Sequence, residues 1–98
     1  MSHFAPFLLA GKSAFVAGGT SGINFALAEA CVRNGARLAV LGRKQEQVEA
    51  AVAHLARFGT ASGYAADVRE YAAVESVLKS CHAVAGPIDI VVSGAAGN

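Results

Sequence analysis

A glycine-rich segment near the start of the chain, residues 18–24, has the composition of a phosphate-binding turn: Gly-Gly-Thr-Ser-Gly-Ile-Asn. It joins a short apolar run, Ser13–Ala17, to a segment of helical composition, Ile23–Arg33. Glycines let the backbone approach a pyrophosphate closely, and free N–H groups at a helix start attract anionic oxygen. Hydroxyl groups within the turn can add donors. A purely structural turn is the alternative, but a position between strand and helix favours dinucleotide binding.

A second candidate position follows the apolar run Arg37–Leu41. An acidic residue at this point would bind the ribose 2′-hydroxyl of NAD and repel the 2′-phosphate of NADP. The chain instead has Gly42, Arg43 and Lys44. A guanidinium can bind a phosphate through two parallel hydrogen bonds. The sequence therefore predicts NADP(H) bound by Arg43, with a solvated arginine at the start of a helix as the alternative.

A third candidate is Asp67, which follows the expected third strand. Its carboxylate could accept a hydrogen bond from an adenine amino group. The spacing Asp67-x-x-Glu70 is also that of a capping box, in which the two side chains satisfy N–H groups at a helix start. The residues alone leave both interpretations open.

Two other patterns are rejected. Gly11-Lys12-Ser13 resembles the end of an ATP-binding P-loop, but the spacing requires glycine where Pro6 stands, and the triplet precedes the strand instead of following it. Cys81-His82 has no second close pair of ligands, so no metal site is expected.

Length and composition set further limits. The chain has 98 residues, enough for one small domain. Its net charge is +1, and the sequence has no cluster of basic residues that would indicate nucleic-acid binding. No apolar run approaches the roughly 20 residues of a membrane span. The apolar N-terminal stretch Phe4–Ala10 is short, so we expect a packing arm and not a signal peptide. Cys31 and Cys81 are expected to be free thiols, which fits a cytoplasmic protein.

Apolar runs alternate with helical segments along the whole chain, in the order β-α-β-α-β-α-β. The pattern predicts an α/β fold with a Rossmann-type doubly wound parallel sheet in the strand order 3-2-1-4. The expected strands are Ser13–Ala17, Arg37–Leu41, Thr60–Ala66 and Ile88–Val92, and the expected helices are Ile23–Arg33, Gln45–Arg57 and a segment from Asp67 to the break at Gly86-Pro87. The fourth strand would leave an apolar edge uncovered. We therefore interpret residues 1–98 as the N-terminal, dinucleotide-binding part of a single domain that needs a C-terminal part of the same protein.

Three motifs, in order and correctly spaced, resemble those of the short-chain dehydrogenase/reductase family. Residues 17–23 are similar to the family's Thr-Gly-x-x-x-Gly-Ile-Gly, residues 67–68 to its adenine-contacting Asp-Val pair, and residues 89–96 to its Asp-x-x-x-Asn-Asn-Ala-Gly. The resemblance favours an adenine contact for Asp67. The expected cofactor-binding residues are Gly18, Thr20, Ser21, Gly22, Ile23, Arg43, Asp67, Val68, Ser93, Gly94 and Ala95.

The chain departs from the family pattern at several positions. Ala17 replaces the motif's threonine, and Asn24 replaces the third glycine, which packs the helix close to the cofactor. This second change bears on the pose of the pyrophosphate. Ser93 and Gly94 replace the paired asparagines, so their backbone can line the ribose but a side-chain amide is lost.

The resemblance implies an NADP(H)-dependent oxidoreductase that acts on a small carbonyl or enoyl substrate. The family's Tyr-x-x-x-Lys pair is not found within residues 1–98. Four residues after Tyr64 stands Val68, and four residues after Tyr71 stands Glu75, where the motif has lysine. The ending Ala95-Ala-Gly-Asn98 looks like that of 2,4-dienoyl-CoA reductases, which implies fatty acid metabolism, and 3-oxoacyl-thioester reductases compete with it. The family is often tetrameric. A non-enzymatic dinucleotide-binding or regulatory module is the alternative.

Overall fold

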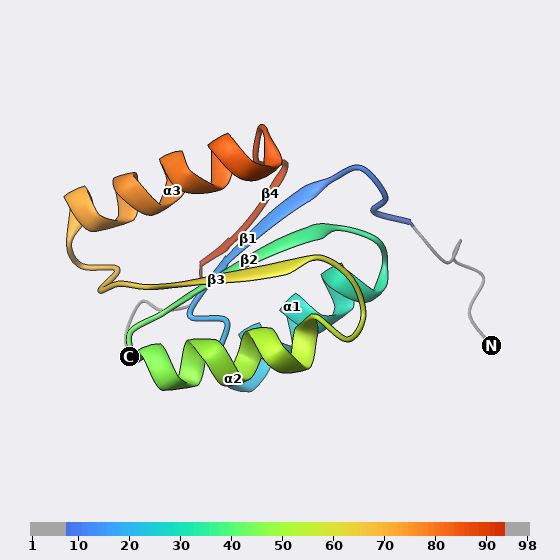
Figure 1. Ribbon diagram of the computed structural model, residues 1–98, viewed down its shortest axis with the longest axis horizontal. Helices are drawn as coiled ribbons and strands as arrows, with labels where there is room; N and C mark the ends of the chain where they lie inside the picture. Colours follow the sequence, from blue (N-terminus) through green and yellow to red (C-terminus); the bar gives the residue numbers. More distant parts are fainter. Residues whose placement is uncertain (1–7, 94–98) are drawn as a thin grey trace.

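Alternating strands and helices build a parallel sheet with helices on both faces (Figure 1). The computed structural model describes residues 8–93. The strands are β1 (Ser13–Ala17), β2 (Arg37–Gly42), β3 (Ala61–Ala65) and β4 (Ile90–Ser93). The helices are α1 (Gly22–Arg33), α2 (Gln45–Leu55) and α3 (Tyr71–Ala85). The sheet order is β3-β2-β1-β4, which confirms the predicted doubly wound topology. In Figure 1, α1 and α2 lie on one face of the sheet and α3 on the other.

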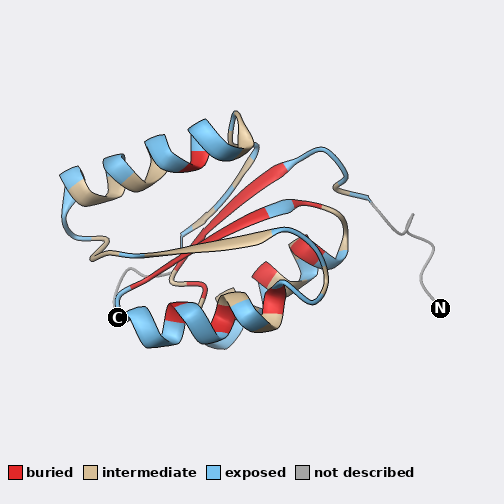
Figure 2. Cartoon of the chain, viewed as in Figure 1, coloured by how far each residue is buried: buried red, intermediate tan, exposed pale blue. Residues whose placement is uncertain are grey.

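The central strands carry the core because helices cover both of their faces (Figure 2). All five residues of β1 and the last five of β2 are buried. Side chains alternate between the two faces, so Val16 packs in the cluster that contains α1 and α2 residues, whereas Phe15 packs in the cluster beneath α3. At one edge, β4 is less covered, and Val91 is 64% exposed.

The register places the carboxyl ends of the strands at the same edge. Ala17 of β1 is level with Leu41 of β2 and with Ser93 of β4. Gly42 of β2 is level with Ala65 of β3. The loops that follow these strands therefore emerge side by side, which is where ligands bind in open α/β sheets.

The third helix begins later than the sequence suggests. It starts at Tyr71 and not at Asp67, so Asp67 and Glu70 do not form a capping box. Asp67 accepts hydrogen bonds from the backbone N–H of Arg69 and from its guanidinium, and its own carbonyl accepts from the Glu70 N–H. These contacts close a turn that delays the helix by four residues.

The fourth strand also begins later, at Ile90 instead of Ile88. The carboxylate of Asp89 accepts a hydrogen bond from the Ser13 backbone N–H at 2.9 Å, and the Asp89 N–H donates to the Ser13 carbonyl at 2.9 Å. One backbone hydrogen bond and one side-chain hydrogen bond thus join Asp89 to Ser13, just ahead of the ladder between β1 and β4. The ladder itself starts one residue later, where Ala14 is level with Ile90.

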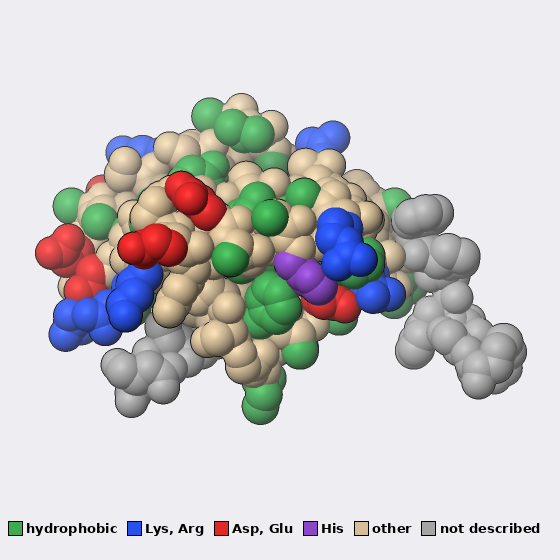
Figure 3. All heavy atoms as spheres, turned by 60° about the horizontal axis from the view of Figure 1, so that its bottom comes forward, with side chains coloured by type: hydrophobic (Ala, Val, Ile, Leu, Met, Phe, Trp, Pro, Cys, Tyr) green, Lys and Arg blue, Asp and Glu red, His purple; other side chains and the backbone are tan. Residues whose placement is uncertain are grey.

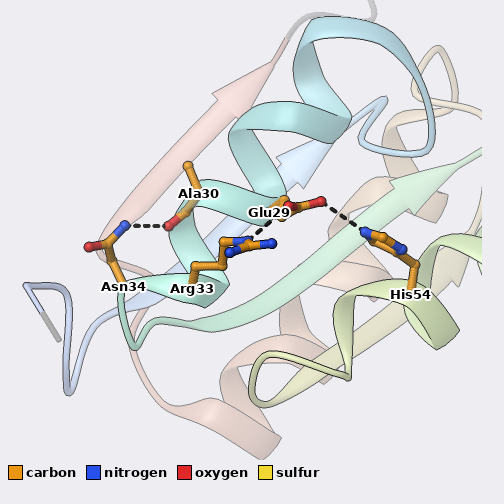
Figure 4. Close-up of polar contacts among 5 residues, drawn as sticks. All are labelled: Glu29, Ala30, Arg33, Asn34 and His54. Carbon is orange, nitrogen blue, oxygen red and sulfur yellow. Dashed lines mark hydrogen bonds and ion pairs between the residues drawn. The ribbon is translucent and has the colours of Figure 1, made fainter. Parts of the chain in front are cut away.

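A polar contact joins α1 and α2, the two helices that share one face of the sheet (Figure 4). Glu29 of α1 accepts a hydrogen bond from Arg33 at 2.9 Å and contacts Nε2 of His54 of α2 at 2.8 Å. The hydrogen bond to His54 is the main cause that lowers the pKa of Glu29. Arg33 also lies over the ring of Phe58, 4.1 Å from its centroid. Figure 3 shows a histidine beside basic side chains on this face.

Close packing of α2 on β3 depends on the absence of a side chain at Gly63. A Cβ atom at this position would lie 2.5 Å from Val48 Cγ1 and 2.6 Å from Val52 Cγ2. Gly63→Ala should therefore push α2 away from the sheet and lower the free energy of unfolding by about 1–3 kcal/mol. Urea denaturation followed by circular dichroism measures this change.

Ala65→Ser is the matched control, because Ala65 lies in the same strand and is exposed. We expect it to change the free energy of unfolding by no more than about 0.5 kcal/mol. A Gly63→Ala variant as stable as this control would show that α2 does not rest on β3 as described.

Candidate functional site

The glycine-rich turn between β1 and α1 is fixed to the neighbouring strand. Gly18 has φ 75° and Gly22 has φ 65°, conformations that residues with a Cβ rarely adopt. The N–H of Gly18 donates to the carbonyl of Leu41 at 2.7 Å, and the N–H of Gly19 donates to the same oxygen at 3.3 Å. Two hydrogen bonds therefore attach the turn to the neighbouring strand at the carboxyl edge of the sheet.

The start of α1 is open to an anionic ligand. The helix begins at Gly22, with Ser21 as an extended N-cap residue, and its first turn contains no acidic side chain. Within residues 8–93, the Ser21 hydroxyl makes no capping hydrogen bond, so the first helical N–H groups and this hydroxyl are available as donors. A Cβ at Gly22 would meet no described atom within 4 Å, and Ile23 is 78% exposed. This geometry suits a pyrophosphate at the helix start.

Gly42 has a packing role that sequence reasoning missed. A Cβ at Gly42 would lie 2.7 Å from Thr20 Cγ2 and 3.0 Å from Val48 Cγ2. Thr20 of the glycine-rich turn thus rests directly on the end of β2. An acidic side chain at this position would require Thr20 and Val48 to shift. The only sequence signal was a glycine that ends an apolar run.

Asn24, in place of the family's third glycine, turns back toward the strand. Its side-chain Nδ2 donates to the carbonyl of Ala17 at 3.5 Å, the long end of hydrogen-bond distances. Asn24 is half-buried. Its side chain therefore points to the carboxyl end of β1, and the bulk of this residue is accommodated between helix and strand.

The basic residue expected to bind a 2′-phosphate lies beside an ion pair. Arg43 follows β2 directly and is exposed. Asp67 follows β3 and forms an ion pair with Arg69 at 2.7 Å. The Arg69 hydrogen bonds hold the pKa of the Asp67 carboxyl well below its usual range, and the charge of Arg43 lowers it further. Figure 3 shows acidic and basic side chains gathered at the left-hand end, where the strands finish in Figure 1.

The predicted cofactor residues that the structure describes all lie at the carboxyl edge of the sheet. The glycine-rich turn follows β1, Arg43 follows β2, and Asp67 and Val68 follow β3. Val68 is half-buried against the core beneath α3. Ser93 ends β4 level with Ala17. Gly94 and Ala95, also predicted to bind the cofactor, lie outside the described residues.

A separate cavity of about 320 Å³ lies near the amino ends of the strands, beneath α3. Its lining includes Ser13, Arg37 and Thr60, the residues at or just before the starts of three strands. Cys81 and Tyr64 also line it, and burial raises the pKa of both groups. Because it lies at the opposite end of the strands from the glycine-rich turn, the cavity does not belong to the candidate cofactor site.

Residues 8–93 contain neither a cluster of metal ligands nor a helix that could span a membrane. Within this range no three His, Cys, Asp or Glu side chains are grouped as they would be around a metal ion. None of the described helices is long and apolar enough to cross a membrane. The P-loop-like triplet Gly11-Lys12-Ser13 runs into the start of β1, at the edge away from the glycine-rich turn, and no described helix N-terminus follows it directly.

Known proteins show where this combination of turn and sheet recurs. The chain is 41% identical over 98 residues to a peroxisomal 2,4-dienoyl-CoA reductase of Saccharomyces cerevisiae, covering 95% of this chain and 34% of the yeast protein. It is 35% identical over 98 residues to a peroxisomal 2,4-dienoyl-CoA reductase of Arabidopsis thaliana, covering 99% of this chain and 33% of the plant protein. The chain thus spans about one third of the length of these curated relatives.

A solved structure agrees in fold. L-sorbose reductase from Gluconobacter frateurii, complexed with NADPH and L-sorbose, superposes with a TM-score of 0.85 and 30% identity, covering 93% of this chain and 35% of the reductase. A sequence model described as short chain dehydrogenase matches residues 12–98, nearly the whole chain. Because this match includes the glycine-rich turn, the four strands and the three helices described above, the chain belongs to the short-chain dehydrogenase family.

Proposed function

We propose that this chain binds NADP(H) in an oxidoreductase that acts on a carbonyl or enoyl substrate. One observation supports the proposal most: the β1–α1 turn, with its two glycines of positive φ, is hydrogen-bonded to Leu41 near the end of β2, two residues before the exposed Arg43. The first feature suits a pyrophosphate, and the second suits a 2′-phosphate. The structurally similar L-sorbose reductase is a complex with NADPH.

The residues of this edge fit a dinucleotide in order. The donors at the start of α1 would bind the pyrophosphate, and Arg43 the ribose 2′-phosphate. Asp67 and Val68 would lie beside the adenine, and Ser93 with Gly94 and Ala95 would line the second ribose. NADPH supplies the hydride, and the residues of this chain bind and orient it.

The proton-transfer part of the reaction is not assigned to this chain. Tyr64 lies in β3 and packs against the core beneath α3, and Tyr71 is exposed at the start of α3. Neither precedes a lysine by four residues. The proposal therefore includes a C-terminal part of the same protein that provides an acid for the carbonyl or enoyl group.

The finer assignments are part of the same proposal. The sequence of residues 95–98 and the two dienoyl-CoA reductase relatives favour an acyl-thioester substrate and a role in fatty acid metabolism. Two free cysteines favour a cytoplasmic location. A tetramer is proposed from the family resemblance alone. Nothing in the comparisons supports the alternative of a non-enzymatic dinucleotide-binding module.

The choice of cofactor gives a first test of function. Arg43→Ala should reduce the preference for NADP⁺ over NAD⁺ by about tenfold or more, because a charge-assisted contact to phosphate contributes about 1.5–3 kcal/mol. Isothermal titration of the full natural chain with each cofactor measures the two dissociation constants.

Arg57→Ala is the matched control, because it removes the same charge from an exposed position between α2 and β3, at the opposite end of the strands. We expect this control to keep the wild-type preference. Equal affinity of the wild-type protein for the two cofactors would contradict the proposal, and so would an Arg43→Ala variant with an unchanged preference.

The glycine-rich turn gives a second test. Gly18→Val should abolish cofactor binding, because a β-branched residue disfavours φ 75° and would occupy the space that the pyrophosphate needs. Gly11→Val is the control, because Gly11 precedes β1, has φ 83°, and a Cβ atom there would meet no described atom within 4 Å. Fluorescence titration with NADPH measures binding, and circular dichroism verifies folding. If both variants lost affinity equally, backbone strain and not the turn would explain the loss.

A further inference from the structure

The carboxylate of Asp67 is fully engaged by one neighbour, Arg69. Arg69 Nε donates to both carboxylate oxygens, at 3.0 and 3.2 Å, and Arg69 Nη2 donates to Oδ2 at 2.7 Å. The backbone N–H of Arg69 adds a fourth hydrogen bond at 2.9 Å. A two-pronged contact of this kind is the strongest geometry between an arginine and a carboxylate.

This ion pair lies next to the arginine that is proposed to bind the 2′-phosphate. The N–H of Ala66 donates to the carbonyl of Gly42 at 2.9 Å, so the segments that leave β2 and β3 start side by side. Arg43 and Asp67 are the next residues of these two segments. They are close enough for the charge of Arg43 to lower the pKa of Asp67. Within residues 8–93, however, Arg43 itself forms no ion pair.

The charges at this edge would be arranged differently without Arg69. Asp67 would then present a bare carboxylate in the segment beside Arg43. A carboxylate attracts a neighbouring guanidinium and repels a phosphate. It would therefore compete with the 2′-phosphate for Arg43. The ion pair cancels the charge of Asp67 and leaves Arg43 available.

We propose that Arg69 is a positioning residue for cofactor choice: by neutralising Asp67, it keeps Arg43 available for the 2′-phosphate of NADP(H). The inference rests on the proposed NADP(H) function. It adds Arg69 as a residue that affects phosphate binding by Arg43 through its ion pair with Asp67. Arg69 is 73% exposed and Asp67 26%, so the pair lies at the surface, where the dinucleotide would approach. The effect is specific to the 2′-phosphate, because NAD(H) lacks this group.

Substitutions can separate this role from a structural one. Arg69→Ala removes the guanidinium but keeps the backbone N–H that closes the Asp67 turn. Its preference for NADP⁺ over NAD⁺ should fall by about three- to fivefold, in line with a surface charge pair. Asp67→Asn combined with Arg69→Ala removes both charges and should restore the ratio of the two affinities to within about twofold of the wild type, because any change at the adenine affects NADP⁺ and NAD⁺ alike and cancels in this ratio. Arg57→Ala serves again as the charge-matched control.

Isothermal titration of the full natural chain with NADP⁺ and NAD⁺ gives the ratio of dissociation constants for each variant, and thermal unfolding verifies that each is folded. A lower ratio in Arg69→Ala that the double variant restores supports the inference. An unchanged ratio in Arg69→Ala, with a wild-type preference for NADP⁺, overturns the inference alone. An equal loss in the single and double variants also overturns it, because Arg69 would then contact the phosphate itself. A wild-type protein without any preference overturns the proposed function together with this inference.

Discussion

The structure depends on the in-register parallel pairing of β1 with β2. This pairing brings the Leu41 carbonyl level with the end of β1, where it accepts hydrogen bonds from Gly18 and Gly19. A backbone oxygen of one strand thus shapes the turn that follows the other. Thr20, the next residue, then lies against Gly42, where an added Cβ atom would clash with its methyl group. The candidate phosphate site is therefore a property of two strands together, and a slip of one residue between them would dismantle it.

Charge at the same edge is balanced in a way that bears on ligand choice. Three basic side chains follow β2 and β3, but only Arg69 is committed to a carboxylate among the residues described. Arg43 and Lys44 take part in no ion pair within residues 8–93. The first turn of α1 adds partial positive charge without an acidic residue to offset it. The proposed binding of a 2′-phosphate and of a pyrophosphate would use this distribution of charge.

Much of the fold was predictable because its signals are local. An unbroken apolar run bounded by glycine predicts a strand buried on both faces, and β1 and β2 are such strands. Amphipathic spacing predicted α2, whose buried residues include Val48 and Leu55. The start of α3 was predicted wrongly at Asp67, because the side chain that can begin a helix can also close a turn before it. Spacing alone does not distinguish these two uses.

The sequence by itself determined the family resemblance, the β-α alternation and the residue types of the candidate site, since motifs and periodicity reside in short stretches of chain. Only the tertiary structure decided which of these residues meet. It placed Thr20 on Gly42 and turned Asn24 back to Ala17. It also committed Asp67 to Arg69 in the segment beside Arg43. The physical reason is that strand register, which is set by packing across the whole sheet, determines which loop ends become neighbours.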